Sequence, residues 1–364
     1  MRFRSERDQL LETLTTTSRA ASSRGGGAPS LSGVRIEVTG DQVGFVGTDL
    51  DLTVRTGFVV SDTSDGVCVV PARLATDIVR SMPPGAVRFS EEGGEAVISA
   101  GRSRFTLRLL PVEGFLRTTE ASGDPVALEA TSFSAALSQV VKAASRDDAR
   151  AILTGVLMAA EAGGLRLVAT DSYRLALRDL PSTSFLAEGQ QVLVPARALS
   201  DLTRILSGAT EVTLRLGQEE ASFQVGQTRL TTRLIEGDFP NYQQLIPSSY
   251  PNRLVVEREP FLDALRRVKL LAREATPVRL GLRADGLTLT AVTQDVGQAT
   301  EEVDAQYAGE EMVVAFNPDF LIEGIEAVGG AEVSIETVDP LKPATLRPVG
   351  SSDYLYLLMP VRVS

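Results

Sequence analysis

The chain has 364 residues, a formal net charge of −11, no histidine and one cysteine. Without histidine, Ser-His-Asp and Cys-His mechanisms lose their general base, and a single cysteine leaves neither an internal disulfide nor a Cys/His zinc site. The negative net charge argues against a protein that binds nucleic acid over its whole surface. We therefore expect no metal and no cofactor.

The N-terminus runs directly into charged sequence over Met1–Asp8, with no apolar signal segment. No apolar run approaches the roughly 18 residues of a membrane helix. The sequence therefore predicts a cytoplasmic protein with no membrane partner. Cys68 lies within the apolar stretch Val67–Val70, which favours a small buried side chain over a reactive thiol.

One unit is repeated three times along the chain. Val70-Pro71-Ala72-Arg73-Leu74 returns as Val194-Pro195-Ala196-Arg197-Ala198, and more loosely around Pro318. A hairpin and a last strand recur in each copy at the same spacing from this motif. Each copy also begins with an amphipathic helical pattern. The predicted helices are Glu6–Ala20, Pro71–Met82, Ser132–Asp147, Pro195–Leu206, Glu259–Arg273 and Pro318–Val328.

Strands such as Glu211–Leu216 and Ala331–Glu336 alternate polar and apolar residues, so they are expected to bury one face. A period above 100 residues indicates domain duplication rather than a solenoid. The prediction is an α+β chain of three similar domains, each with two helices on a sheet layer. Loop-like sequence places their boundaries at residues 1–121, 122–249 and 250–364.

The stretch Leu165–Leu177 predicts a hairpin, because apolar strands flank a Thr-Asp-Ser turn. Tyr173 and Arg174 follow the turn beside Leu175, a combination typical of binding surfaces rather than of catalysis. An ordinary structural hairpin is the alternative interpretation.

Five of the six predicted helices together carry 12 basic and eight acidic residues, although the whole chain is acidic. The sixth, Pro318–Val328, has no basic residue and three acidic ones. The bias is modest, and an ordinary solvated face would explain it equally well.

Several motifs occur together: Thr170-Asp171-Ser172-Tyr173-Arg174-Leu175, the two Val-Pro-Ala-Arg helix starts, Gly101–Phe105, Glu236–Tyr242 and Met359-Pro360-Val361-Arg362. With these motifs the whole chain resembles the β subunit of bacterial DNA polymerase III, the sliding-clamp family. The resemblance implies three similar domains and a head-to-tail dimer that closes into a ring around duplex DNA. It implies no catalysis, and it implies location at the nucleoid.

The resemblance also implies a surface that binds short linear peptides of the polymerase III alpha subunit, the clamp loader and other DNA polymerases or repair proteins. Its residues here would be Leu153, Thr170, Ser172, Tyr173, Arg174, Leu175, Pro240, Leu245, Phe320, Pro343, Leu357, Leu358, Met359, Pro360, Val361 and Arg362. Tyr173, Arg174 and Arg362 would form its rim. A closing strand packed in the core is the alternative for Leu357–Val361.

This sequence departs from the family at three places on that surface. Ser172-Tyr173 stands where some members have Gly-His, Gln244 stands where an Arg is common, and Val363-Ser364 follows Arg362. The peptide preference of the surface is therefore left open.

Contact with DNA is expected to be weak and independent of base sequence, because many tight phosphate contacts would pin a ring in one place. Arg24 and Arg73 match arginines of the family motif, and helix placement adds further candidates. The DNA-facing set is Arg24, Arg73, Arg146, Arg150, Arg197 and Arg204. For the homodimer contact, the resemblance points to Phe105 and Leu107 of one chain against Leu270 and Leu271 of the other.

Two other functions are alternatives for this sequence. A carboxylate-dependent enzyme would use Asp49 with Asp51, or Asp147 with Asp148. Adjacent carboxylates diverge on a helix or a strand, and no third ligand or base is evident. A scaffold that binds partners without encircling DNA is the other alternative.

Overall fold

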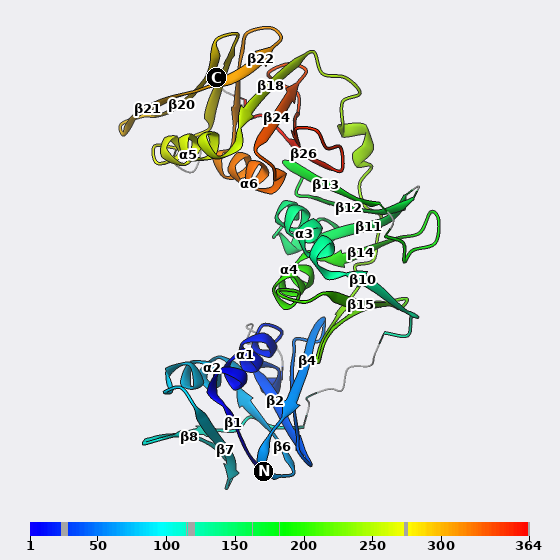
Figure 1. Cartoon of the computed structure of the whole chain (residues 1–364), viewed down its shortest axis with the longest axis vertical. Helices are drawn as coiled ribbons and strands as arrows, with labels where there is room; N and C mark the ends of the chain where they lie inside the picture. The colour runs from blue at the N-terminus through cyan, green and yellow to red at the C-terminus, as the bar shows by residue number, and fades with distance from the viewer. Residues whose placement is uncertain are drawn as a thin grey trace. The chain divides into compact units, whose positions relative to one another are not determined.

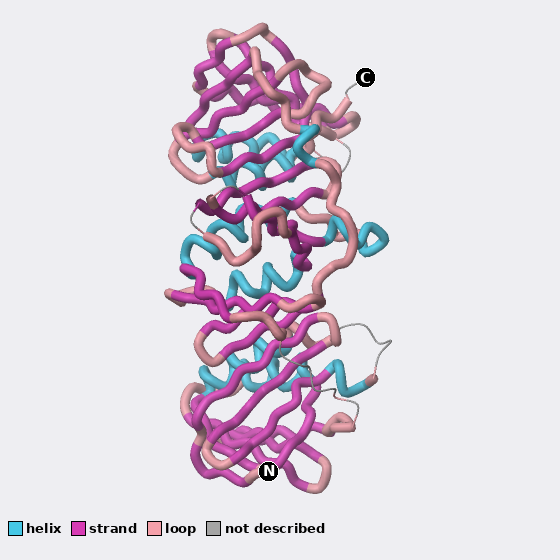
Figure 2. Tube along the Cα trace, turned by 90° about the vertical axis from the view of Figure 1, so that its right-hand side faces the viewer, coloured by secondary structure: helices cyan, strands magenta, loops and turns pink. Residues whose placement is uncertain are grey.

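The computed structural model describes residues 1–22, 28–113, 115, 121–161, 163–181, 183–272 and 276–362. The chain divides into two compact units. Unit 1 comprises Met1–Thr131 with Ala198–Leu234, and unit 2 comprises Ser132–Arg197 with Ile235–Ser364. In the view of Figure 2, the strands of each unit face the reader and most helical segments lie behind them.

Unit 1 contains two antiparallel sheets. The five-stranded sheet has the order β5 (Ser61–Ser64), β1 (Arg2–Glu6), β7 (Ala86–Glu92), β8 (Glu95–Ala100) and β9 (Ser103–Arg108). The eight-stranded sheet has the order β10 (Pro125–Glu129), β15 (Glu211–Leu216), β16 (Glu220–Val225), β17 (Thr228–Arg233), β4 (Leu52–Val59), β3 (Gln42–Thr48), β2 (Gly33–Thr39) and β6 (Gly66–Pro71).

Unit 2 also contains two antiparallel sheets. The nine-stranded sheet has the order β14 (Gln191–Pro195), β11 (Gly155–Glu161), β12 (Gly164–Thr170), β13 (Arg174–Pro181), β26 (Tyr354–Leu358), β25 (Ala344–Pro348), β24 (Glu332–Thr337), β18 (Asn252–Glu257) and β22 (Ala305–Ala308). The four-stranded sheet has the order β21 (Gly297–Val303), β20 (Gly286–Thr293), β19 (Val278–Arg283) and β23 (Met312–Phe316).

The helices form at each predicted position, two to a repeat (Figure 1). They are α1 (Arg7–Ser18), α2 (Ala72–Ser81), α3 (Ala130–Val140), α4 (Ala196–Ile205), α5 (Arg258–Lys269) and α6 (Pro318–Val328). Short 3-10 turns occur at Pro29–Ser32, Val141–Ala143, Asp148–Thr154 and Tyr242–Leu245. The prediction for the third helix was too long, because α3 ends at Val140 and the chain tightens into a 3-10 turn.

Helix α2 buries one apolar stripe against a sheet and exposes its charged residues. In α2, Ala75, Ile78 and Val79 are buried, whereas Arg73 and Arg80 are exposed. This spacing matches the 3.6-residue period of a helix that packs on one side only. The core of unit 1 joins this stripe to Phe3, Phe45 and Phe89 from the strands, and it also encloses Cys68, as predicted.

Both large sheets are built from two successive repeats. β17 of the second repeat pairs with β4 of the first, and β26 of the third repeat pairs with β13 of the second. The two compact units therefore cut across the second repeat. The boundaries 1–121, 122–249 and 250–364 stay a prediction.

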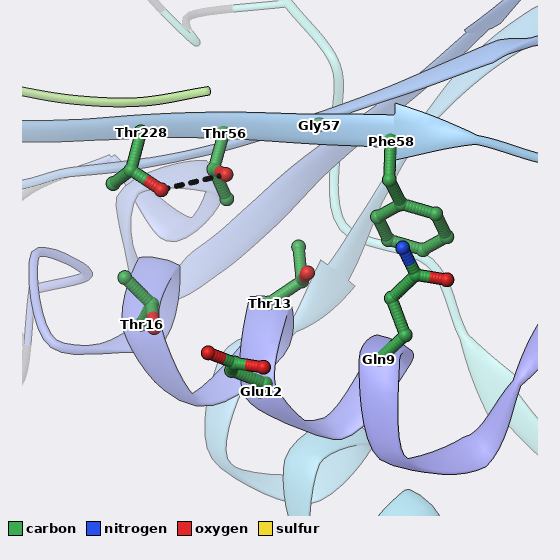
Figure 3. Close-up of a pocket in the computed structure, with 8 residues that line it drawn as sticks. All are labelled: Gln9, Glu12, Thr13, Thr16, Thr56, Gly57, Phe58 and Thr228. Carbon is green, nitrogen blue, oxygen red and sulfur yellow. Dashed lines mark hydrogen bonds between the residues drawn. The ribbon is translucent and has the colours of Figure 1, made fainter. Parts of the chain in front are cut away.

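A pocket in unit 1 lies between α1 and the paired strands β4 and β17 (Figure 3). It is lined by Gln9, Glu12, Thr13, Thr16, Thr56, Gly57, Phe58 and Thr228. Thr228 donates a hydrogen bond of 2.9 Å to the Thr56 hydroxyl.

The strand register explains this pocket. Thr228 of β17 lies opposite Thr56, and at the equivalent place in unit 2 Tyr354 of β26 lies opposite Arg178 of β13. Tyr354 is fully buried, and its hydroxyl donates to the carbonyl of Gln139 on α3. Thr228 thus stands at the strand position that Tyr354 occupies in the next repeat.

Candidate functional surfaces

The hairpin between β12 and β13 has the Thr-Asp-Ser turn predicted from the sequence. The Thr170 hydroxyl donates to the Arg174 carbonyl at 2.7 Å and accepts the Ser172 N–H at 3.1 Å. One carboxylate oxygen of Asp171 accepts the N–H groups of Tyr173 and Arg174 at 2.9 and 3.0 Å. Short polar side chains thus satisfy the backbone donors of a tight reversal.

The first repeat builds the same turn from Thr48 and Asp49. The residue after the Asp has positive φ in both turns, 83° at Leu50 and 80° at Ser172. The turn is therefore a shared structural device. The position of Arg174 holds Leu52 in the first repeat, so the arginine is the distinguishing feature of the second hairpin.

Arg174 is buried, with 7% of its surface exposed, and it ties three segments together. Its guanidinium forms ion pairs with Asp171 and with Glu323 of α6, and donates to the Lys142 carbonyl. Its Cζ lies 4.2 Å from the centre of the Phe320 ring. Contrary to the prediction, Arg174 is not a rim residue, because its partners draw it into the protein.

Tyr356 completes this network by donating to the Phe320 carbonyl at 2.9 Å. Burial raises the pKa of the Tyr356 hydroxyl, although the charge of Arg174 opposes the rise. Burial alone would lower the pKa of Arg174, but Tyr356 and Glu323 outweigh it, so its pKa lies above the usual arginine value. The guanidinium is a fixed positive charge.

The residues predicted to bind peptides fall into two groups. Thr170, Leu175, Leu357 and Leu358 are buried with Arg174, and for Leu357 and Leu358 this agrees with the alternative of a closing strand packed in the core. Leu175 and Leu357 share an apolar cluster with Tyr242 and, at its margin, Phe239 and Ile246. The exposed or half-buried members are Leu153, Ser172, Tyr173, Pro240, Leu245, Phe320, Pro343, Met359, Pro360, Val361 and Arg362.

Exposed apolar side chains remain beside the hairpin and the C-terminal tail. Tyr173 is 61% exposed, Leu245 49%, Met359 38% and Val361 38%. The Met359 N–H donates to the Tyr173 carbonyl at 2.9 Å, and the Val361 N–H donates to the Ala315 carbonyl at 2.8 Å. The tail is thereby fixed beside the hairpin tip. We call Ser172, Tyr173, Leu245, Met359 and Val361 the hairpin–tail surface.

Most basic residues on the helices are paired with carboxylates. Arg73 is 97% exposed at its side chain and lies 3.9 Å from Asp77, and Arg204 lies 2.9 Å from Asp201. Arg146 and Arg197 are also exposed. Arg24 lies outside the described residues.

Arg150 differs from the other predicted DNA-facing residues. It pairs with Asp147 at 3.0 Å and donates to the Asp171 carbonyl at 3.2 Å. Its guanidinium therefore supports the hairpin turn, a role that its position in the sequence did not reveal.

The predicted dimer residues lie at or near the free edges of two sheets. β9 and β21 are the end strands of the five-stranded and four-stranded sheets. Phe105 of β9 is 39% exposed, and Leu270, just after α5, is 81% exposed, with Leu271 half-buried beside it. Leu107 is buried in the core of unit 1, so its side chain does not offer a contact as predicted.

Two of the four carboxylates proposed for the alternative enzyme accept hydrogen bonds from the backbone. Asp49 accepts the N–H groups of Asp51 and Leu52, and Asp147 accepts the N–H of Ala149. In the described part of the chain, no group of three or more His, Cys, Asp or Glu residues is arranged to hold a metal ion. Nor does any helix of the described ranges have the length and apolar character needed to cross a membrane.

Sequence reasoning missed three members of the Arg174 network. Glu323, Tyr356 and the Lys142 carbonyl reach Arg174 from 149, 182 and 32 residues away along the chain. The available signal was that Arg174 directly precedes the apolar run Leu175–Leu177, because a charge at the start of a buried strand needs a partner.

Three family descriptions match successive parts of the chain. Residues 1–118 match the N-terminal domain of the DNA polymerase III beta subunit, residues 127–241 its central domain, and residues 243–362 its C-terminal domain. The beta sliding clamp of Streptomyces coelicolor is 35% identical over the full length of both chains. That of Caulobacter vibrioides is 31% identical over 92% of this chain and 93% of the relative.

Solved structures are similar to this protein along its whole chain. The DNA polymerase sliding clamp of Bacillus subtilis has a TM-score of 0.89 and 26% identity, and covers both chains completely. A sliding clamp of Pseudomonas aeruginosa bound to griselimycin has a TM-score of 0.89 and 30% identity over the same full coverage. The similarity extends through all three repeats.

Proposed function

Because the chain belongs to the DNA polymerase III beta-subunit family, the non-catalytic sliding clamps of DNA replication, we propose that two copies join head to tail into a ring. This ring encircles duplex DNA without reading its sequence. It tethers polymerases and other DNA-processing proteins through short peptides. The proposed setting is the cytoplasm, at the nucleoid.

The pairing of the sheets supports the ring and is the observation that carries the proposal. Within the chain, the last strand of each later repeat pairs with the hairpin of the repeat before it, as β17 with β4 and β26 with β13. In the first repeat the last strand is β9, and in the third repeat the second strand of the hairpin is β21. Among the strands that the structure describes, neither has such a partner. Joining β9 of one chain to β21 of another would repeat the same junction.

Such a contact is heterologous, because it uses two different surfaces of each chain, and heterologous contacts produce closed rings when the rotation closes. Phe105 and Leu270 would supply exposed apolar side chains to it, with Leu271 at its margin. Unpaired edge strands normally need cover to prevent nonspecific association. We propose that the partner chain provides this cover.

The hairpin–tail surface is proposed to bind the peptides. Tyr173 offers a large amphipathic ring, and Met359 offers a flexible apolar side chain. Both lie beside a hairpin that buried Arg174 holds rigid. A rigid surface loses little entropy on binding, so a few anchor residues of a peptide are enough. The proposed partners are the polymerase III alpha subunit, the clamp loader and other DNA polymerases or repair proteins.

The experiment is fluorescence anisotropy of a labelled Gln-Leu-x-Leu-Phe peptide with the full chain and with Tyr173→Ala/Met359→Ala. We expect micromolar binding by the native chain and a loss of at least about tenfold in the variant, because two exposed anchors are truncated. Leu341→Ala is the matched control, since Leu341 is exposed to 67% but lies outside the hairpin–tail surface. Equal binding by all three chains would contradict this peptide site.

A further inference from the structure

Two helices carry the same arrangement of charges. Arg73, Asp77 and Arg80 on α2 have the spacing Arg-x-x-x-Asp-x-x-Arg, and Arg197, Asp201 and Arg204 repeat it on α4. At the equivalent positions of α6 the chain has Phe320, Gly324 and Ala327. Because α6 forms without these charges, the fold of the repeat does not require them.

On α2 the carboxylate lies between the two arginines. One Asp77 oxygen is 2.6 Å from a guanidinium nitrogen of Arg80, and the other is 3.9 Å from Nε of Arg73. All three side chains are at least half exposed. An exposed pair of this kind contributes little to stability and can exchange partners.

On α4 the carboxylate is held more firmly. The side chain of Asp201 is only 10% exposed and lies 2.9 Å from Arg204 and 3.6 Å from Arg19, which directly follows α1. Asp201 therefore engages a second cation from the first repeat. Glu326 of α6 also lies near two cations, 3.1 Å from Arg266 and 3.4 Å from Lys142, although not at the helix position that corresponds to Asp201.

We infer that Asp77 and Asp201 are internal competitors of DNA phosphate: they pair with Arg80 and Arg204, Asp77 also lies near Arg73, and they thereby keep the binding of the ring to DNA weak. This inference rests on the proposed function, since it requires these helices to face the duplex. A carboxylate and a phosphate oxygen accept the same guanidinium hydrogen bonds. A phosphate therefore competes with the carboxylate for the positive charge, and most directly for the Arg80 and Arg204 nitrogens that already lie 2.6 and 2.9 Å from a carboxylate oxygen.

The consequence concerns mobility. Every phosphate that a protein neutralises adds about 0.9 to the salt exponent of binding, and strong binding of this type slows movement along DNA. Arginines that are already paired still give the helix face a mild positive potential. They do so without committing each guanidinium to one phosphate.

The test is Asp77→Asn, because Asp77 is half exposed and its removal leaves no buried charge without a partner. The full chain is titrated onto a short labelled duplex between about 20 and 200 mM NaCl, a range in which phosphate contacts dominate the salt dependence. We expect Asp77→Asn to bind about three- to tenfold more tightly at the low end. We also expect a salt slope steeper by about 0.9 for each phosphate gained.

Glu37→Gln is the matched control. It removes the same charge and releases Arg35, 2.7 Å away, on strand β2 rather than on a helix. A gain of affinity in Asp77→Asn but not in Glu37→Gln supports the inference, and equal gains in both overturn it by showing a general charge effect. Arg73→Ala tests separately whether this helix face contacts DNA at all.

If Arg73→Ala weakens DNA binding while Asp77→Asn leaves affinity and slope unchanged, the helix face contacts DNA but the carboxylate is not a competitor. If neither variant changes binding, the proposed DNA face is wrong and the inference falls with it. Asp77→Asn in an Arg73→Ala/Arg80→Ala chain should show no gain, because the arginines that it would release are gone.

Discussion

Ser172 is held at a φ of 80°, a left-handed conformation that L residues adopt at a cost. Two hydrogen bonds of the turn hold the backbone there, one to the N–H of Ser172 and one to that of Tyr173. Leu50 has a similar φ in the first repeat, so the strain belongs to the turn and not to one side chain. Glycine at this position would adopt the conformation freely.

We expect Ser172→Gly to raise the free energy of unfolding by about 0.5 kcal/mol. The relief of about 1–2 kcal/mol of left-handed strain exceeds the added flexibility of the unfolded chain, about 0.4–1 kcal/mol. Urea unfolding measures the change. Ser138→Gly, in the interior of α3, should instead lower stability by a similar amount. A lower stability of Ser172→Gly would show that the turn is not strained.

The site was predictable from sequence wherever it depends on neighbours in the chain. The Thr170-Asp171 turn forms from contacts within four residues, and the sequence identified it. The burial of Arg174 depends on Glu323 and Tyr356, which are far away in the chain. Alternation along a strand shows which face a residue occupies, but not which distant charge meets it there.

At the level of elements, the helix positions could be predicted from the spacing of apolar residues and from the prolines. Helix α6 begins at Pro318 directly after Asn317, whose side chain accepts the N–H groups of Asp319 and Phe320. The end of α3 was misjudged because apolar residues continue beyond Val140, while the backbone changes to a 3-10 turn. Such changes depend on packing against the next element rather than on local preference.

The pocket between α1 and β4 gives a prediction at this scale. Thr228→Tyr should place a ring where Tyr354 packs in the next repeat, and should raise stability by about 1 kcal/mol through burial of apolar surface. Differential scanning calorimetry measures the shift of the transition. Thr228→Val removes the hydrogen bond to Thr56 without filling the space, so it should give no gain. A destabilised Thr228→Tyr would mean that the two repeats pack differently here.

For the whole molecule, the threefold repeat was readable because the Val-Pro-Ala-Arg motif returns at Pro195 after Pro71. The sharing of sheets between repeats was not readable, because pairing of β17 with β4 joins strands that are far apart in sequence. That sharing is the physical basis for a ring. It leaves β9 and β21 as the two edges that a second chain would join.

The most direct test of the ring is its release from DNA. The chain is loaded onto a nicked circular duplex by a bacterial clamp loader, isolated by gel filtration, and the DNA is then cut once. We predict that the protein stays on the circle and leaves after linearisation, because topology retains it rather than phosphate contacts. Phe105→Glu/Leu270→Glu should weaken the dimer contact and abolish retention on the circle, because two like charges would replace the apolar side chains of the proposed contact. Equal retention on circular and linear DNA would contradict the ring and favour a scaffold.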